Sequence, residues 1–101
     1  MVLKIIRAVD LNKYLNRSDV YLLDIRSKEE FAHFHIEHAI HVPEQNLDIF
    51  MQKRGKRAMY ILCCQRGVTS VREGKRLCQK GYSVATLAGG VAAYQKFFAS
   101  R

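Results

Sequence analysis

The stretch YILCCQRGVTSVREG, residues 60–74, places two adjacent cysteines between an apolar run and a polar turn. The second of them, Cys64, ends the apolar run and precedes a short segment that contains an arginine and a glycine. A cysteine in such a place becomes a nucleophile when a helix N-terminus or a nearby cation stabilises its thiolate. Cys64 is therefore the candidate catalytic residue, and the predicted chemistry is attack by a thiolate sulfur.

The residues after Cys64 predict a loop that binds an anion. Backbone N–H groups at the start of a helix point outwards and carry about half a positive charge. Arg66 adds a full charge, and Gly67 allows the positive φ that brings backbone close to a ligand. A hydroxyl group of Thr69 or Ser70 is expected to cap the helix that follows. We expect the loop to keep the Cys64 sulfur ionised and open to solvent. The predicted binding residues are Gln65, Arg66, Gly67, Val68, Thr69 and Ser70.

The other two cysteines are predicted to be structural. Cys63 precedes Cys64 in the same strand, so the two side chains should point to opposite faces of a sheet. Cys78 shares a helical face with Val71 and should lie in the core. The alternative for Cys64 is that it too is a buried structural thiol. Adjacent cysteines do not match the C-x-x-C spacing of zinc or dithiol sites, so we predict no metal.

Strands and helices alternate along the sequence and so predict a parallel sheet that is covered by helices on both faces. The expected strands span residues 3–6, 20–25, 39–43, 58–64 and 82–87, and the expected helices span residues 9–15, 27–34, 44–53, 69–80 and 91–98. The run 58–64 is the most apolar and should be central. Asp10 is an expected N-cap, and two capping boxes are expected, one from Ser27 and Glu30 and one from Ser70 and Glu73.

The length of 101 residues suggests one compact domain, residues 1–101, in one fold class, α/β. No apolar stretch approaches the roughly 20 residues of a membrane-spanning helix, and the N-terminus does not resemble a secretory signal, so a cytoplasmic protein is expected. The net charge is +8, and residues 51–80 alone contain nine basic residues and one acid. In sequence this charge is centred on the cysteines, where it would attract nucleic acid or a small oxyanion, or simply form a solvated face.

Four stretches together resemble the rhodanese, or thiosulfate sulfurtransferase, family. They are LLDIRSKEEFAHFHIEHAIHVP, the loop CQRGVTS with its six-residue form from Cys64 to Thr69, GKRLCQKGY and LAGGVAAY. The resemblance covers about residues 5–98 and implies a three-layer α/β/α fold around a parallel sheet of about five strands.

The resemblance also implies the activity. Cys64 would take a sulfane sulfur from thiosulfate or a persulfide donor, become a persulfide, and pass the sulfur to cyanide, sulfite or a thiol, including a protein thiol. Arg66 matches a loop position where a basic residue helps to bind thiosulfate. No metal or organic cofactor is implied.

The chain departs from the family pattern at several positions. Phe34 and His38 stand where glycines are usual, and Glu37 where a proline is common. Gln65 stands at a frequently basic loop position, which leaves one side-chain cation in the loop. Tyr94 replaces a common tryptophan. Asp24 and Arg26 are interpreted as structural, with Arg26 paired to a carboxylate such as that of Glu30.

Three alternatives compete with a sulfurtransferase. Phosphatases of this fold use Cys-x5-Arg, but the sixth residue after Cys64 is Ser70, so a phosphate would lack its guanidinium clamp. A non-catalytic interaction module of the same fold would usually lack the cysteine. A nucleic-acid binder is suggested by charge alone, since no aromatic residues interleave the basic residues of 66–80.

Overall fold

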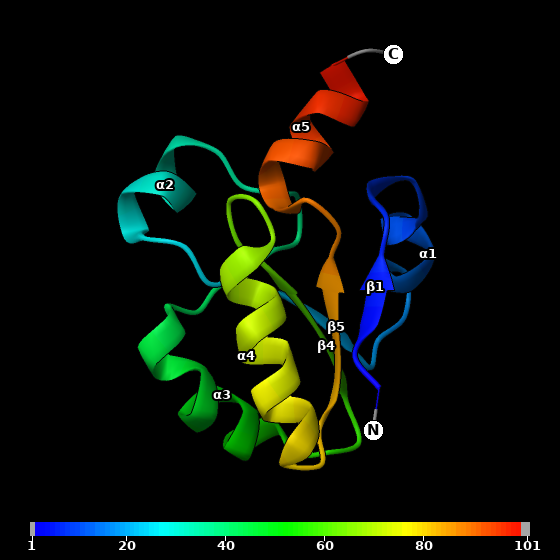
Figure 1. Ribbon diagram of the computed structural model, residues 1–101, viewed down its shortest axis with the longest axis vertical. Coiled ribbons are helices and arrows are strands. Elements are labelled where there is room, and N and C mark those ends of the chain that lie inside the picture. The colour runs from blue at the N-terminus through cyan, green and yellow to red at the C-terminus, as the bar shows by residue number, and fades with distance from the viewer. Residues whose placement is uncertain (1, 100–101) are drawn as a thin grey trace.

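The computed structural model describes residues 2–99, so residues 1, 100 and 101 of the expected 1–101 domain lie outside the described part. Five strands form one parallel sheet in the order β1-β5-β4-β2-β3, as predicted (Figure 1). The strands are β1 Lys4–Ile6, β2 Val20–Asp24, β3 Ile40–His41, β4 Met59–Cys63 and β5 Ser83–Leu87.

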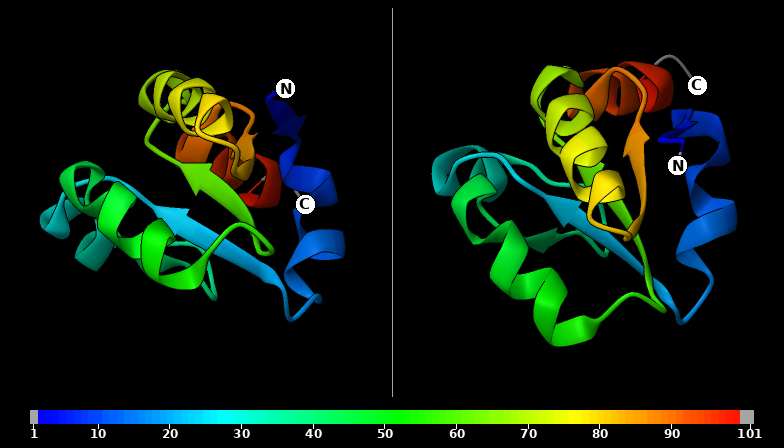
Figure 2. Two further views of the ribbon diagram at one scale, coloured as in Figure 1. Left: turned by 90° about the horizontal axis from the view of Figure 1, so that it is seen from below. Right: turned by 60° about the horizontal axis from the view of Figure 1, so that its bottom comes forward.

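Helices cover both faces of the sheet, which gives the expected three layers (Figure 2). One face packs against α3 and α4, and the other packs against α1 and α5. The helical segments are η1 Ala8–Asp10, α1 Leu11–Leu15, α2 Lys28–His33, η2 Glu44–Asn46, α3 Leu47–Arg54, α4 Val68–Gln79 and α5 Gly90–Ala99. None of the helices in the described part combines the length and the apolar character needed to cross a bilayer.

The central strand β4 is apolar along its length because both of its faces are buried. Leu62 belongs to the core beneath α3 and α4, whereas Ile61 and Cys63 belong to the core beneath α1 and α5. All three side chains are fully buried. The prediction that the run 58–64 lies at the centre of the sheet is therefore confirmed, and so is the structural role expected for Cys63.

Helix starts were predicted with mixed success. The capping box of Ser27 and Glu30 is present in full, with each side chain bonded to the other's backbone N–H. Asp10 is the N-cap of α1 as expected, but its carboxylate bonds Arg7 and Lys13 and not a backbone N–H of the helix. The capping box expected for Ser70 and Glu73 is wrong, because α4 begins earlier, after Gly67.

Acids from outside residues 51–80 neutralise part of the positive charge of this segment. Arg72 pairs with Glu44, and Arg76 pairs with Asp48 and with Glu73, so acids near the start of α3 neutralise arginines on α4. Within residues 2–99, four cations in the last turn of α3 and in the turn before β4 have no carboxylate partner. They are Lys53, Arg54, Lys56 and Arg57.

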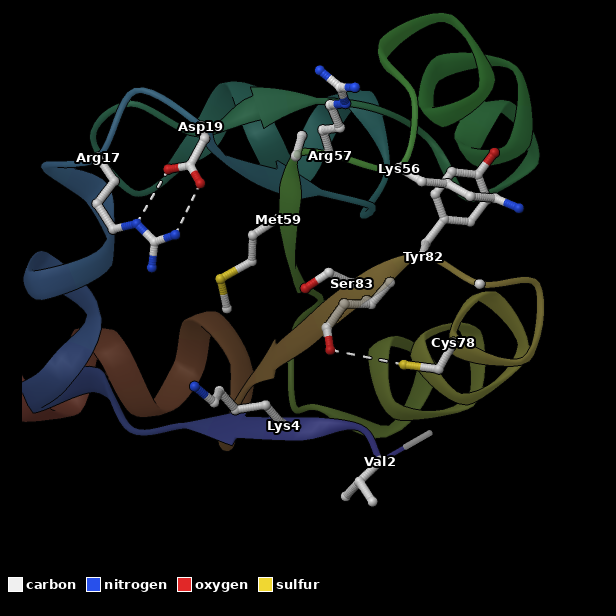
Figure 3. A pocket seen from close by; sticks show the side chains of 13 residues that line it. Val2, Lys4, Arg17, Asp19, Lys56, Arg57, Met59, Cys78, Tyr82 and Ser83 are labelled. Atoms are coloured by element: carbon white, nitrogen blue, oxygen red, sulfur yellow. Dashed lines mark hydrogen bonds and ion pairs between the residues drawn. The ribbon is translucent and has the colours of Figure 1, made fainter.

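That turn lies at the amino end of β4, the end remote from Cys64. A hollow of about 490 Å³ opens there between Lys4, Arg57 and Ser83. In Figure 3, Arg17 pairs with Asp19 across one side of this hollow, and Lys56 lies beside the ring of Tyr82. The expectation that the positive charge is centred on the cysteines therefore holds along the sequence but not in space.

His38 has a left-handed backbone, with a φ of 75°. This conformation strains a residue with a Cβ, which explains why glycine suits the position. We expect His38→Gly to raise the free energy of unfolding by about 0.5–1 kcal/mol, because relief of strain exceeds the added entropy of the unfolded chain. Urea denaturation measures the change. His33→Gly, in the last turn of α2, is the matched control and should lower stability instead; a loss for both variants would contradict the argument.

Candidate functional site

Cys64 directly follows β4, at the carboxyl end of the central strand. Ligands of open parallel sheets bind at this end of the strands. Only Gln65, Arg66 and Gly67 separate Cys64 from the first residue of α4. Gly67 has a φ of 93°, so it supplies the positive φ that was expected of it. The tight turn brings the amino end of α4 back over the cysteine sulfur.

Backbone N–H groups of the loop point at the Cys64 sulfur. The N–H of Gly67 donates to Sγ at 3.1 Å, and the N–H of Ser70 donates to it at 3.3 Å. The Ser70 hydroxyl oxygen lies 3.5 Å from the same sulfur. Hydrogen bonds from N–H groups stabilise the charged form of an acceptor, and the helix N-terminus adds to this effect. The arrangement suits a thiolate and, equally, an anion bound next to it.

Cys64 is more buried than the sequence suggested. Only 6% of the residue is exposed, whereas a sulfur open to solvent was expected. Cys64 belongs to the core on the α3 and α4 face of the sheet, and the start of α5 lies beside the loop backbone (Figure 1). The N–H of Val91 donates to the Cys64 carbonyl at 2.9 Å, and the N–H of Ala92 donates to the Gln65 carbonyl at 3.0 Å.

Gly90, the first residue of α5, has no room for a side chain. A Cβ at Gly90 would lie 2.3 Å from the Cys64 carbonyl oxygen and 2.7 Å from the Gln65 carbonyl carbon. Gly90 also has a φ of 67°. Close approach of α5 to the loop therefore requires glycine at this position. In this way Gly90 lets the start of α5 bond the carbonyls of Cys64 and Gln65.

Ser70 contacts the Cys64 sulfur through its N–H and its hydroxyl group and does not cap the helix. Its hydroxyl shares a 2.6 Å hydrogen bond with the hydroxyl of Thr86, and both residues are fully buried. The expected cap by Thr69 or Ser70 is wrong, because Gly67 is the N-cap and has no side chain. Thr86 was missed by the sequence reasoning, although a threonine in a buried strand signals a polar group that needs a partner.

Arg26 connects the loop after Cys64 with Asp24, the last residue of β2. Its guanidinium binds the carboxylate of Asp24 at 2.8 Å, and the two side chains are 6% and 0% exposed. The pairing expected with Glu30 is therefore wrong. Arg26 also donates to the side-chain oxygen of Gln65 at 3.1 Å and to the carbonyl of Phe34 at 2.6 Å. Gln65 is thus held towards Arg26, and a cation at this position would face another cation.

The remaining loop side chains face solvent. Arg66 and Val68 are exposed, and within residues 2–99 no hydrogen bond or ion pair engages the Arg66 guanidinium. Thr69 is half-buried. The structure therefore brings the backbone of Gly67 and Ser70 to the sulfur, whereas Arg66 remains free to meet an anion from outside. Among the described residues no cluster of histidine, cysteine, aspartate or glutamate could hold a metal ion.

A family model for the rhodanese-like domain matches residues 7–97 of the chain. The chain belongs to this family. Among solved structures, the rhodanese-like domain protein of Staphylococcus aureus is 28% identical, with a TM-score of 0.79, and the match covers 91% of each chain.

Parts of two larger proteins have a similar fold. Thiosulfate sulfurtransferase from Pseudomonas aeruginosa is 23% identical, with a TM-score of 0.81, and the match covers 96% of this chain and 19% of that chain. Reduced CoADR-RHD of Bacillus anthracis is 21% identical, with a TM-score of 0.85, and the match covers 98% of this chain and 18% of that chain. This chain therefore spans about a fifth of either protein, and the likeness at these identities shows the shared fold.

Proposed function

We propose that this rhodanese-like domain is a sulfurtransferase that carries a sulfane sulfur on Cys64. The observation that carries the proposal is the position of Sγ under the N–H groups of Gly67 and Ser70 at the start of α4. Membership of the rhodanese-like family supports the same chemistry. Thiosulfate and low-molecular-weight persulfides are the proposed donors, and cyanide, sulfite or a thiol are the proposed acceptors.

In the first step the Cys64 thiolate attacks the outer sulfur of thiosulfate. A new S–S bond forms to Cys64, the S–S bond to the sulfonate breaks, and sulfite leaves with the electron pair. In the second step an acceptor takes the outer sulfur, and Cys64 returns to a thiolate. Such a covalent intermediate gives double-displacement kinetics.

The loop residues have distinct proposed roles in this cycle. The N–H groups of Gly67 and Ser70 stabilise the thiolate before attack and again when the electron pair returns to Sγ. Arg66, which has no polar partner within residues 2–99, binds the charged end of the donor. Gln65 is held by Arg26 and so fixes the start of the loop directly after Cys64.

Incubation with a donor followed by intact-mass measurement tests the proposal. Thiosulfate or a glutathione persulfide should add one sulfur atom to the protein, and cyanide should remove it with formation of thiocyanate. If neither donor nor any other persulfide loads the protein, the sulfurtransferase proposal fails. That result, combined with a protein partner whose binding is unaffected by Cys64→Ser, would identify a non-catalytic interaction module.

A further inference from the structure

An apolar groove adjoins the loop on the side of α4 that faces β1. It has a volume of about 490 Å³. It lies between the first turns of α4 and the paired strands β1 and β5, where Ile5 is in register with Thr86 (Figure 1). Its lining includes Ile5, Arg66, Val68, Val71 and Ala88.

Large apolar side chains stand exposed along this groove. Val68 is 76% exposed, and Ile5 is 54% exposed. Contiguous exposed apolar surface on a soluble domain marks a place where a partner binds. Here that surface borders the very loop that surrounds Cys64, whereas a site for small inorganic anions needs no apolar wall.

Gly67 lies between the groove and the Cys64 sulfur. This residue lines the groove, and its N–H donates to Cys64 Sγ at 3.1 Å. Thr86 also lines the groove and bonds Ser70, which contacts the same sulfur. A molecule seated in the groove therefore contacts residues that are themselves bonded to the Cys64 sulfur or to its partner Ser70. Arg66 lies on the rim with its charge unpaired among residues 2–99.

We propose that the groove seats the acceptor of the second step, and that this acceptor is a cysteine of a partner protein, flanked by apolar residues and an acidic residue. The inference rests on the proposed function and specifies its acceptor. The apolar residues of the partner cover Ile5 and Val68, and its acid meets Arg66. The acceptor cysteine then points past Gly67 towards the persulfide.

The transfer is balanced without any further reagent. The partner's thiolate attacks the outer sulfur of the Cys64 persulfide and forms a new S–S bond. The S–S bond to Cys64 breaks, and its electron pair returns to Sγ as the thiolate. The transferred sulfur keeps its oxidation state, and its proton, if present, stays on it.

The exposed side chains favour a protein segment over a small acceptor. Cyanide and sulfite are too small to cover both Ile5 and Val68, and a polar thiol such as glutathione has no apolar surface to offer them. Burial of apolar surface is the main source of affinity in protein association. The cation on the rim selects for an acidic neighbour and raises the rate of encounter with it.

Peptide acceptors test the inference in a single turnover. The protein is first loaded with one sulfur and then mixed with acetyl-Glu-Leu-Cys-Val-Leu-amide or with a polar counterpart in which serine replaces leucine and valine. A third peptide carries glutamine in place of glutamate. Each rate is divided by that peptide's rate with a small aromatic disulfide, which corrects for thiol reactivity. The apolar acidic peptide should take sulfur roughly fivefold faster than the polar one, and roughly twofold faster than the glutamine peptide.

Two matched variants locate the effect on the surface. Ile5→Ser should lower the ratio of the apolar-peptide rate to the cyanide rate by roughly threefold, since it removes apolar contact. Val9→Ser replaces a β-branched residue that is 49% exposed in η1 and does not line the groove. It should leave the ratio unchanged.

The outcomes separate the two proposals. If no sulfur loads onto Cys64, the proposed function fails and the acceptor inference falls with it. If loading and transfer to cyanide proceed, but the corrected peptide rates are equal or glutathione outpaces the apolar peptide, only the acceptor inference is overturned. An equal loss of ratio in Ile5→Ser and Val9→Ser would overturn it too.

Discussion

Cys64→Ser should lose sulfur transfer by at least about a thousandfold, because the thiolate that attacks the donor is removed. A serine hydroxyl stays protonated under the same N–H groups and forms no persulfide. The measurements are thiocyanate formation from thiosulfate and cyanide, and the intact mass after incubation with donor. No sulfur should be found on the variant.

The other two cysteines supply the controls for this prediction. Burial, and next the charge of Asp24, raise the pKa of the Cys63 thiol far above its ordinary value, so this cysteine stays protonated. Cys78 is also buried, and its Sγ faces the carbonyl of Val84. Cys63→Ala and Cys78→Ala should therefore still load one sulfur. Loading that persists in Cys64→Ser and disappears in Cys63→Ala would reassign the nucleophile.

Asp24→Ala should lower the free energy of unfolding by about 3–5 kcal/mol, because it leaves the buried Arg26 charge without its counter-ion. Arg26 cannot escape by deprotonation, since a guanidinium stays protonated in proteins even without a carboxylate partner. The same change should loosen the loop, because Arg26 also holds Gln65. Urea denaturation reports the first effect, and the rate of sulfur loading in the folded protein reports the second.

The pair of Arg17 and Asp19 is the matched control for Asp24→Ala. It joins the same residue types at the same 2.8 Å separation, but its side chains are about half exposed. Water already solvates both charges there, so Asp19→Ala should shift the urea midpoint far less. Equal midpoint shifts for the two variants would show that burial does not make the Asp24 pair contribute more to stability than an exposed pair.

The features predicted correctly from the sequence are those that depend on neighbouring residues alone. The apolar run that ends in Cys64 predicts a buried central strand, because a strand with both faces covered has no polar side to show. The capping box of Ser27 and Glu30 is equally local and forms as expected. Gly67 follows from the need for a turn between strand and helix, and its positive φ is present.

The surroundings of the sulfur were predictable only in part, because they come from segments far away in the sequence. Thr86 reaches Ser70 from β5, and the start of α5 closes over the carbonyls of Cys64 and Gln65. Neither contact leaves a periodic signal in the stretch around the cysteine. These long-range contacts are visible only in the fold, whereas the failed helix cap of Ser70 follows from the earlier start of α4, after Gly67.

The partition of charge between the two ends of the sheet has a kinetic consequence. The cations without a carboxylate partner at the end of α3 and in the turn before β4 are separated from Cys64 by the length of β4, roughly 15 Å, which exceeds the Debye length of about 8 Å at physiological salt. Added potassium chloride should therefore slow thiosulfate turnover only as weakly as expected for the single charge of Arg66. A steep logarithmic dependence on ionic strength would mean that the distant basic turn also guides the donor.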